Sequence, residues 1–252
     1  MIRNLENYTN RIILKENRGG SRFYSLDSNL EINVPSYTRK IIHSIGVGDC
    51  YNSAFAALEN DFELNAALRY ASIIASEYAA TTYPNNFKES VENWMKINRT
   101  EFLSLKGISL KYEDRKKINI YIAAPDFDYV DRTKIDEVEE ALIYHNFSPR
   151  RPILENGQAS LQSRKSEKQK LLNSDLELLY MCQILIVVLL FDDPGTYIEL
   201  GIAIEKSMPT LVYDPYSKAK NLFLTEIPNF TSDDLDEIIN QVFIISDGLI
   251  NE

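Results

Sequence analysis

Cysteine and histidine are scarce in this sequence, which has two of each in 252 residues. The two cysteines, Cys50 and Cys182, lie far apart and form no Cys-x-x-Cys motif, so the sequence indicates neither a zinc site nor a disulfide framework. Unpaired thiols suit a reducing compartment. We therefore expect the protein to act in the cytoplasm, without a metal and without an organic cofactor.

Long apolar runs are also lacking. The longest run, Ile184 to Phe191, is far shorter than the roughly 20 residues that cross a bilayer. Residues 1–8 contain no apolar core of the kind found in export signals. The sequence therefore predicts neither export nor membrane insertion.

Positive charge is in deficit. The chain has 27 Lys and Arg residues against 37 Asp and Glu residues, which gives a net charge of -10, and no long basic stripe interrupts this excess. A nucleic acid or another polyanion is therefore an unsuitable partner. The hydrophobic share of 44% and the charged share of 25% are those of an ordinary globular protein that can bury a sizeable core.

The chain is long enough for one large domain or two small ones. A dense run of charged residues, Lys111–Lys117, interrupts the apolar patterns on either side of it. We place the domain boundary in this run, and we expect domains at residues 1–115 and 116–252.

The first domain has a small α/β pattern. Apolar residues recur at helical spacing between positions 49 and 81, which predicts two helices packed on a sheet, with a break at Asn60–Asp61 and an end at Pro84. Two short apolar runs read as strands: Arg11–Leu14 and Leu30–Val34.

In the second domain, predicted strands alternate with predicted helices. The strands are Ile118–Ala124, Ser148–Leu154, Ile184–Leu190 and Thr210–Tyr213. The helices are Asp131–Tyr144, Ser174–Met181, one that starts at Thr196, and Asp234–Val242, which leads into a candidate edge strand at Phe243–Ser246. The polar stretch Asn156–Asn173 is expected to form a loop or an exposed helix over the site. The alternation predicts a doubly wound, flavodoxin-like parallel sheet.

Two carboxylates follow the most apolar strand. Ile184–Leu190 runs into an acidic turn with Asp193, and the helix after that turn carries Glu199. Because ligands of open α/β sheets bind outside the carboxyl ends of the strands, we expect both carboxylates to act on a small molecule. One alternative stays open, since Thr196-x-x-Glu199 is also a capping box, in which the Glu side chain would bind its own helix start.

Three motifs in this domain occur in a characteristic order. They are Tyr121-Ile-Ala-Ala-Pro125-Asp126-Phe127, then Asp175, then Asp193-Pro-Gly195-Thr196-Tyr-Ile-Glu199-Leu-Gly201. Together they resemble the nucleoside 2-deoxyribosyltransferase family over residues 118–215. Two positions depart from the family pattern: Ala124 replaces the usual Gly before Pro, and Cys182–Gln183 replaces an Asp before the third strand.

The resemblance implies an N-glycosyl enzyme that acts on a nucleoside or nucleotide, and a homo-oligomer. It makes Glu199 the nucleophile that attacks the anomeric carbon, and Asp193 the group that handles the proton of the leaving base. The implied substrate-binding residues are Tyr121, Pro125, Asp126, Phe127, Asp175, Gly195 and Thr196. The chemistry is consistent with these roles, because cleavage of an N-glycosidic bond develops oxocarbenium character that a carboxylate and a proton donor stabilise.

Several of these residues also have an alternative interpretation in which their role is purely structural. Asp175 would serve equally as the N-cap of its helix, Tyr121 as a core residue, and Asp126 as a turn residue. The basic clusters Arg150–Arg151 and Arg164–Lys170 either bind a substrate 5′-phosphate or form solvated faces.

The first domain carries a glycine motif of its own. Gly46-Val-Gly48-Asp49 and the helix after it resemble the Gly-Ala-Gly-Asp signature of ribokinase-like (PfkB) sugar kinases, over residues 40–85. The resemblance implies that Gly46 and Gly48 hold a phosphate at the helix start and that Asp49 is the base. Only 43 residues precede Ser44, which is too few for a complete sugar site. We expect a truncated fragment with a vestigial phosphate site, retained for assembly or for holding a nucleotide; a tight strand-to-helix turn is the plain alternative.

The sequence thus supports three functions. The first is cleavage of the bond between base and sugar, by transfer to another base or by hydrolysis. The second is a non-catalytic nucleotide sensor. The third is phosphoryl transfer through Asp49, with the missing kinase half supplied by another chain.

Overall fold

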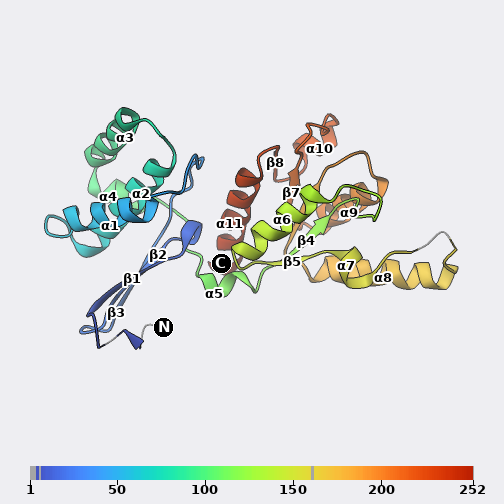
Figure 1. The fold of residues 1–252 in the computed structure, drawn as a ribbon, viewed down its shortest axis with the longest axis horizontal. Coiled ribbons are helices and arrows are strands. Elements are labelled where there is room, and N and C mark those ends of the chain that lie inside the picture. The colour runs from blue at the N-terminus through green and yellow to red at the C-terminus, as the bar shows by residue number, and fades with distance from the viewer. Residues whose placement is uncertain (1–3, 6, 160–161, 252) are drawn as a thin grey trace. The chain divides into compact units, whose positions relative to one another are not determined.

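The computed structural model describes residues 4–5, 7–159 and 162–251. The chain divides into two compact units, Met1–Lys111 (unit 1) and Tyr112–Glu252 (unit 2) (Figure 1). None of the helices in the described ranges combines the length and the apolarity that crossing a membrane requires.

Unit 1 begins with three antiparallel strands and continues with helices. The strands, in the order β1-β2-β3, are β1 (Arg11–Lys15), β2 (Ser21–Ser25) and β3 (Leu30–Val34), with a short 3₁₀ helix η2 (Asn17–Gly19) after β1. The helices are α1 (Val47–Leu58), α2 (Leu64–Ala79), α3 (Pro84–Lys96) and α4 (Arg99–Ser104). Both predicted strands are confirmed, and β2, which pairs with each of them, was missed because its five residues, SRFYS, include two serines and an arginine.

The predicted helix pair packs on this sheet. Phe23 and Val34 of the strands share a core with Tyr51 and Phe55 of α1 and Leu68 of α2. The break between α1 and α2 falls where the sequence predicts it.

The expectation that Pro84 ends these helices is wrong. The second helix already ends at Ala79, and Pro84 is the first residue of α3. A proline suits that position because the first helical N–H has no partner within the helix.

Unit 2 contains a five-stranded parallel sheet, preceded by the short helix α5 (Tyr112–Arg115). The strands are β4 (Asn119–Ala123), β5 (Ser148–Arg150), β6 (Ile184–Val188), β7 (Thr210–Tyr213) and β8 (Phe230–Ser232). Their spatial order is β5-β4-β6-β7-β8, which is the flavodoxin-like order 2-1-3-4-5. The predicted doubly wound sheet is therefore confirmed.

Helices cover both faces of this sheet (Figure 1). On one face, α6 (Thr133–Tyr144) packs on β5, α11 (Leu235–Asn251) packs on β7 and β8, and the two helices touch each other. On the other, α8 (Lys165–Met181) packs on β4, and α9 (Pro194–Glu205) packs on β4, β6 and β7. All five residues of β6 are buried, as expected for a parallel strand between two helical layers. The remaining helices are α7 (Pro152–Asn156) and α10 (Leu222–Glu226).

Two predicted elements have different starts or ends in the structure. The strand predicted at Ser148–Leu154 stops at Arg150, because Pro152 begins α7. The helix predicted at Ser174–Met181 begins at Lys165, where Arg164 and Glu167 form a capping box. Its first half is polar and exposed, so it carries no apolar periodicity that would reveal it.

The predicted edge strand Phe243–Ser246 is wrong, because these residues belong to α11. Ile238, Val242, Phe243 and Ser246 are buried along one stripe of that helix, at helical spacing. The fifth strand is β8, which has only three residues and gives too short an apolar pattern to be recognised.

Candidate active site

The acidic turn after β6 starts α9, and Asp193 is its N-cap. The Oδ2 atom of Asp193 accepts hydrogen bonds from the backbone N of Thr196 at 2.8 Å and from Thr196 Oγ1 at 2.9 Å. Pro194 follows as the first helical residue. A carboxylate at this end of a helix also satisfies free N–H groups and meets the positive end of the helix dipole.

Glu199 does not cap its own helix, so the capping-box alternative is wrong. Because Asp193 fills the cap, the Glu199 side chain is released to face the sheet, where Tyr121 Oη donates a hydrogen bond to Glu199 Oε1 at 2.7 Å. Among the described residues, no side chain donates a hydrogen bond to the second oxygen, Oε2. One carboxylate oxygen is thus fixed and the other is left for chemistry.

Tyr121 is a core residue whose hydroxyl also contacts Glu199. Its side chain is completely buried among residues of β4, α8 and α9, yet its hydroxyl reaches Glu199. Burial raises the pKa of Tyr121, and the negative charge of Glu199 raises it further. The hydroxyl therefore stays protonated and remains a donor to the carboxylate.

The surroundings of Glu199 strongly favour its protonated form. Burial raises its pKa from the ordinary value of 4.5 to about 7; the hydrogen bond from Tyr121 lowers it, and the charges of Asp175 and Asp193 raise it. The charges of Asp175 on α8 and of Asp193 at the cap therefore both act on Glu199, and a buried carboxyl with a perturbed pKa is typical of active sites.

Asp175 lies inside α8 rather than at its start, so the N-cap alternative is wrong for this residue. Asn156 Nδ2, at the end of α7, donates a hydrogen bond to Asp175 Oδ1 at 2.8 Å. Burial raises the pKa of Asp175, and this hydrogen bond lowers it. Sequence reasoning missed Asn156, because its partner lies on another helix and no motif links the two.

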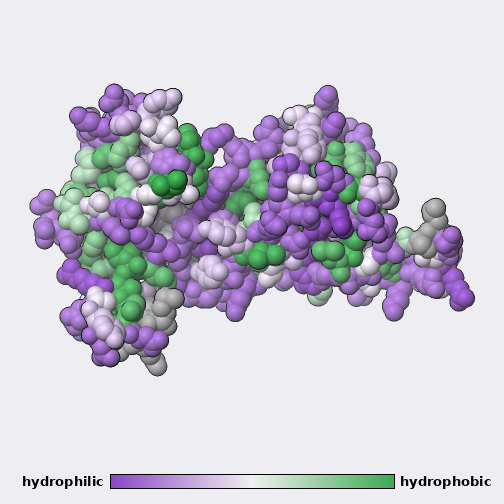
Figure 2. All heavy atoms as spheres, in the orientation of Figure 1, coloured by the Kyte–Doolittle hydropathy of each residue, from purple (hydrophilic) through white to green (hydrophobic). Residues whose placement is uncertain are grey.

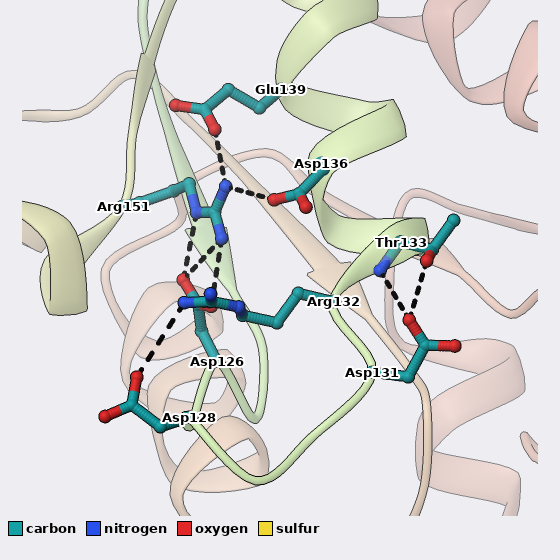
Figure 3. Close-up of polar contacts among 8 residues, drawn as sticks. All are labelled: Asp126, Asp128, Asp131, Arg132, Thr133, Asp136, Glu139 and Arg151. Carbon is teal, nitrogen blue, oxygen red and sulfur yellow. Dashed lines mark hydrogen bonds and ion pairs between the residues drawn. The ribbon is translucent and has the colours of Figure 1, made fainter.

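The turn after β4 carries Pro125, Asp126 and Phe127. Pro125 is buried, and Asp126 is 4% exposed, with its two oxygens accepting hydrogen bonds from Nε and Nη2 of Arg151, each at 2.9 Å (Figure 3). Phe127 stacks on the exposed ring of Tyr129, with ring centroids 5.4 Å apart. The reading of Asp126 as a mere turn residue is therefore incomplete, and its contact with a substrate stays a prediction.

Gly195 and Thr196 shape the cap. A Cβ atom on Gly195 would lie 3.1 Å from Asp193 Oδ2, closer than side chains normally approach, so glycine allows the cap to close. Thr196 is 2% exposed and gives both its N–H and its hydroxyl to Asp193. Both residues therefore hold Asp193 in place, and a direct contact with a substrate stays a prediction for each.

The two basic clusters have different surroundings. Arg150 pairs with Glu155, and Arg151 is buried against acidic side chains. The residues Arg164–Lys170 lie at the exposed start of α8, the hydrophilic end of that helix in Figure 2. The structure thus favours ion pairs for the first cluster and a solvated face for the second.

A polar pocket of about 370 Å³ opens at the carboxyl ends of β7 and β8. It is lined by Asp214, Ser217, Ala219, Thr231, Ser232 and Asp233. Burial and the hydrogen bond to Asp192 raise the pKa of Tyr197 on α9 to about 12, and the charges of Asp192, Asp193 and Asp214 also raise it. The pocket therefore lies on the same edge of the sheet as the acidic turn, beyond β6.

The glycine motif of unit 1 begins α1. Gly46 is the N-cap in a left-handed conformation, with φ of 75°, which favours glycine. The carbonyl of Gly48 accepts a hydrogen bond from Lys15 Nζ at 3.0 Å, and Asp49 is exposed in the first turn. This geometry fits a tight turn, and ligand binding there stays a prediction.

Comparison with known proteins points to one family. Residues 120–241 match the nucleoside 2-deoxyribosyltransferase family, which confirms the resemblance expected for unit 2. A similar solved structure is a 2-deoxyribosyltransferase from the psychrotolerant bacterium Bacillus psychrosaccharolyticus, with 20% identity, a TM-score of 0.44, and coverage of 48% of this chain and 89% of that chain. Another is a conserved protein from Enterococcus faecalis V583, with 17% identity, a TM-score of 0.41, and coverage of 50% and 96%. No curated protein matches the chain.

Proposed function

We propose that unit 2, whose residues 120–241 match the nucleoside 2-deoxyribosyltransferase family, cleaves the bond between base and sugar in nucleosides or nucleotides. The observation that carries the proposal is the 2.7 Å hydrogen bond from the buried Tyr121 hydroxyl to Glu199, beside two further carboxylates. It fixes one oxygen of a carboxylate at the carboxyl edge of a parallel sheet, where ligands bind.

In the first step, Glu199 Oε2 attacks the anomeric carbon as the bond from that carbon to the base nitrogen breaks. The bonding electron pair leaves with the base, and the sugar becomes an ester of Glu199. Positive charge develops on the sugar ring in the transition state, and the negative charges of Glu199 and Asp175 stabilise it. Tyr121 keeps the attacking group aligned, because its hydroxyl is fixed in the core.

The leaving base needs a proton, and we propose that Asp193 gives it one as the bond to the sugar breaks and is left as a carboxylate. The Oδ2 atom of Asp193 is occupied by the helix cap, and among the described residues no donor contacts Oδ1. Oδ1 is thus the atom that faces the base in this proposal.

In the second step, an acceptor breaks the sugar ester and frees Glu199. A second base attacking through its ring nitrogen gives transfer, and water gives hydrolysis. The acceptor loses a proton, which Asp193 takes up, so the cycle returns both carboxylates to their starting states. The ratio of the two outcomes depends on how well the occupied site excludes water.

The experiment is the release of free base, measured by chromatography, from a panel of deoxynucleosides and their monophosphates, with and without a second base. We expect release with the wild type and its loss in Glu199→Ala. The matched control is Glu205→Ala, an exposed carboxylate on the same helix. Release from no member of the panel, or equal release by Glu199→Ala and the wild type, would contradict the proposal.

For unit 1 we infer a ribokinase-like glycine motif that holds a nucleotide or supports assembly. The support is the left-handed Gly46 cap and the exposed Asp49 in the first turn of α1. Thermal unfolding with ATP or ADP tests it, because a ligand that binds the folded state raises the Tm. A shift that Asp49→Asn reduces supports nucleotide binding, and an unchanged Tm at millimolar nucleotide leaves assembly as the role.

A further inference from the structure

We propose that Arg151 is a positioning residue of this site, which holds the turn after β4, residues 125–129, at the carboxyl edge of the sheet. The inference rests on the proposed function, since this turn carries the predicted substrate contacts Pro125, Asp126 and Phe127. Arg151 itself is proposed to touch no substrate.

The guanidinium of Arg151 is enclosed by carboxylates, as Figure 3 shows. The side chain is 4% exposed; Nε and Nη2 bind the two oxygens of Asp126, and Nη1 binds Asp136 at 2.7 Å and Glu139 at 2.5 Å. Burial lowers the pKa of Arg151, but the hydrogen bonds to its carboxylates outweigh burial and raise it. The planar fork of an arginine matches a carboxylate at two points, so the pair fixes orientation as well as distance.

These four residues join separate parts of unit 2. Arg151 follows the edge strand β5, Asp126 lies in the turn after β4, and Asp136 and Glu139 lie on α6. A single side chain therefore ties the turn to the neighbouring strand and to a helix on one face of the sheet.

The turn has few other polar contacts that could orient it. Its backbone hydrogen bonds are local, from Asp126 N to Ala124 O, from Phe127 N to Pro125 O, and from Val130 N to Phe127 O. Such bonds set the shape of the turn, but they do not set its position on the sheet. The contact between Asp126 and Arg151 spans 25 positions of sequence and supplies that position.

A second arginine extends the network on the solvent side. Arg132 lies 4.0 Å from both Asp126 and Asp128, with 38% of its side chain exposed. Exposed ion pairs at this distance contribute little to stability. The buried Arg151, rather than Arg132, therefore decides the position of the turn.

The same short segment also reaches Asp175. Arg151 is the cap of α7 and Asn156 is the last residue of that helix, where it donates to Asp175 Oδ1. Arg151 thus lies at the start of the segment whose last residue contacts Asp175, whereas the Tyr121–Glu199 hydrogen bond lies on other elements.

Steady-state kinetics separates positioning from stability. Arg151→Gln or Asp126→Asn alone leaves a buried charge without its partner and lowers stability. The double variant removes this buried pair and should recover part of the lost stability, although Asp136 and Glu139 lose their cation. We expect the double variant to fold. Its KM for deoxynucleoside should rise about tenfold or more, and its kcat should change less than about threefold, because a displaced turn weakens substrate binding. Arg151→Lys, which keeps the charge but not the fork, should fall between it and the wild type.

Arg150→Gln is the matched control. Arg150 is the last residue of β5 and pairs with Glu155 rather than with the carboxylates that hold Arg151, and its loss should leave KM unchanged. Recovery of the wild-type KM in the double variant would overturn the proposal, because the pair would then act on stability alone.

Hydrogen–deuterium exchange tests the positioning without activity. We expect the amides of Asp126, Phe127 and Val130 to exchange about tenfold faster in the double variant than in the wild type or Arg150→Gln, because the turn opens locally. Unchanged exchange would overturn the proposal. Absence of base release by the wild type would refute the proposed function instead, and this measurement would still decide the role of Arg151.

Discussion

At the scale of single residues, the site depends on one hydrogen bond between Tyr121 and Glu199. The proposed nucleophile, Glu199, must be ionised, and burial has raised its pKa to about 7. We therefore expect kcat/KM for base release to rise with pH through about 7. Tyr121→Phe removes a bond that favours the ionised form, so the rising limb should move to higher pH by about one unit. A pH–rate profile of both proteins checks this, and a limb at the same pH in both would contradict it.

The raised pKa of Glu199 also predicts that the folded protein loses stability as the pH rises. Between pH 4.5 and about 7 the folded protein binds more protons at Glu199 than the unfolded chain does, so its stability falls as the pH rises through this window. Glu199→Gln removes the titration. We expect it to be more stable than the wild type by about 3 kcal/mol at pH 8, and nearly equal to it at pH 4.5. Urea unfolding at both pH values measures this difference. A wild type that is more stable than Glu199→Gln at pH 8 would contradict the prediction.

Motifs made Asp193 and Glu199 candidate site residues, but the contacts around them could not be predicted from the sequence. Asn156 and Arg151 act on Asp175 and Asp126 across 19 and 25 positions, from elements whose packing no local pattern encodes. The capping-box alternative failed for a similar reason. Spacing allowed Glu199 to be a capping residue, and only the structure shows that Asp193 already fills the cap.

At the scale of elements, the start of α9 depends on the cap that Asp193 makes. Asp193→Ala should destabilise the protein by about 1 kcal/mol, because an N-cap is lost. Asp193→Ser keeps a capping oxygen and should restore most of that stability while base release stays low. Chemical unfolding and base release, measured on the same samples, separate the two roles. Full activity in Asp193→Ser would show that Asp193 serves only as a cap.

The elements that the sequence predicted well are those with strong apolar periodicity. The strand at β6 and the helix pair α1 and α2 are of this kind. The polar first half of α8 and the three-residue β8 carry little such signal, because one is solvated and the other is short. The first half of α8 and β8 could be identified only from the structure.

At the scale of the whole molecule, the site residues of the proposed glycosyl chemistry all lie in unit 2. A deoxynucleoside should therefore slow hydrogen exchange in Tyr112–Glu252 and leave Met1–Lys111 unaffected, because bound ligand stabilises the unit that holds it. Exchange mapped by mass spectrometry, with and without ligand, checks this. Protection around Gly46 would instead indicate that unit 1 holds the nucleotide.

The measurement that bears most directly on the central claim is mass spectrometry of the protein mixed with a deoxynucleoside and quenched in acid. The account predicts a deoxyribosyl ester on the peptide that contains Glu199, absent from Glu199→Gln and discharged by an added base. Rapid base release with no ester on this peptide, under conditions that preserve such esters, would contradict it.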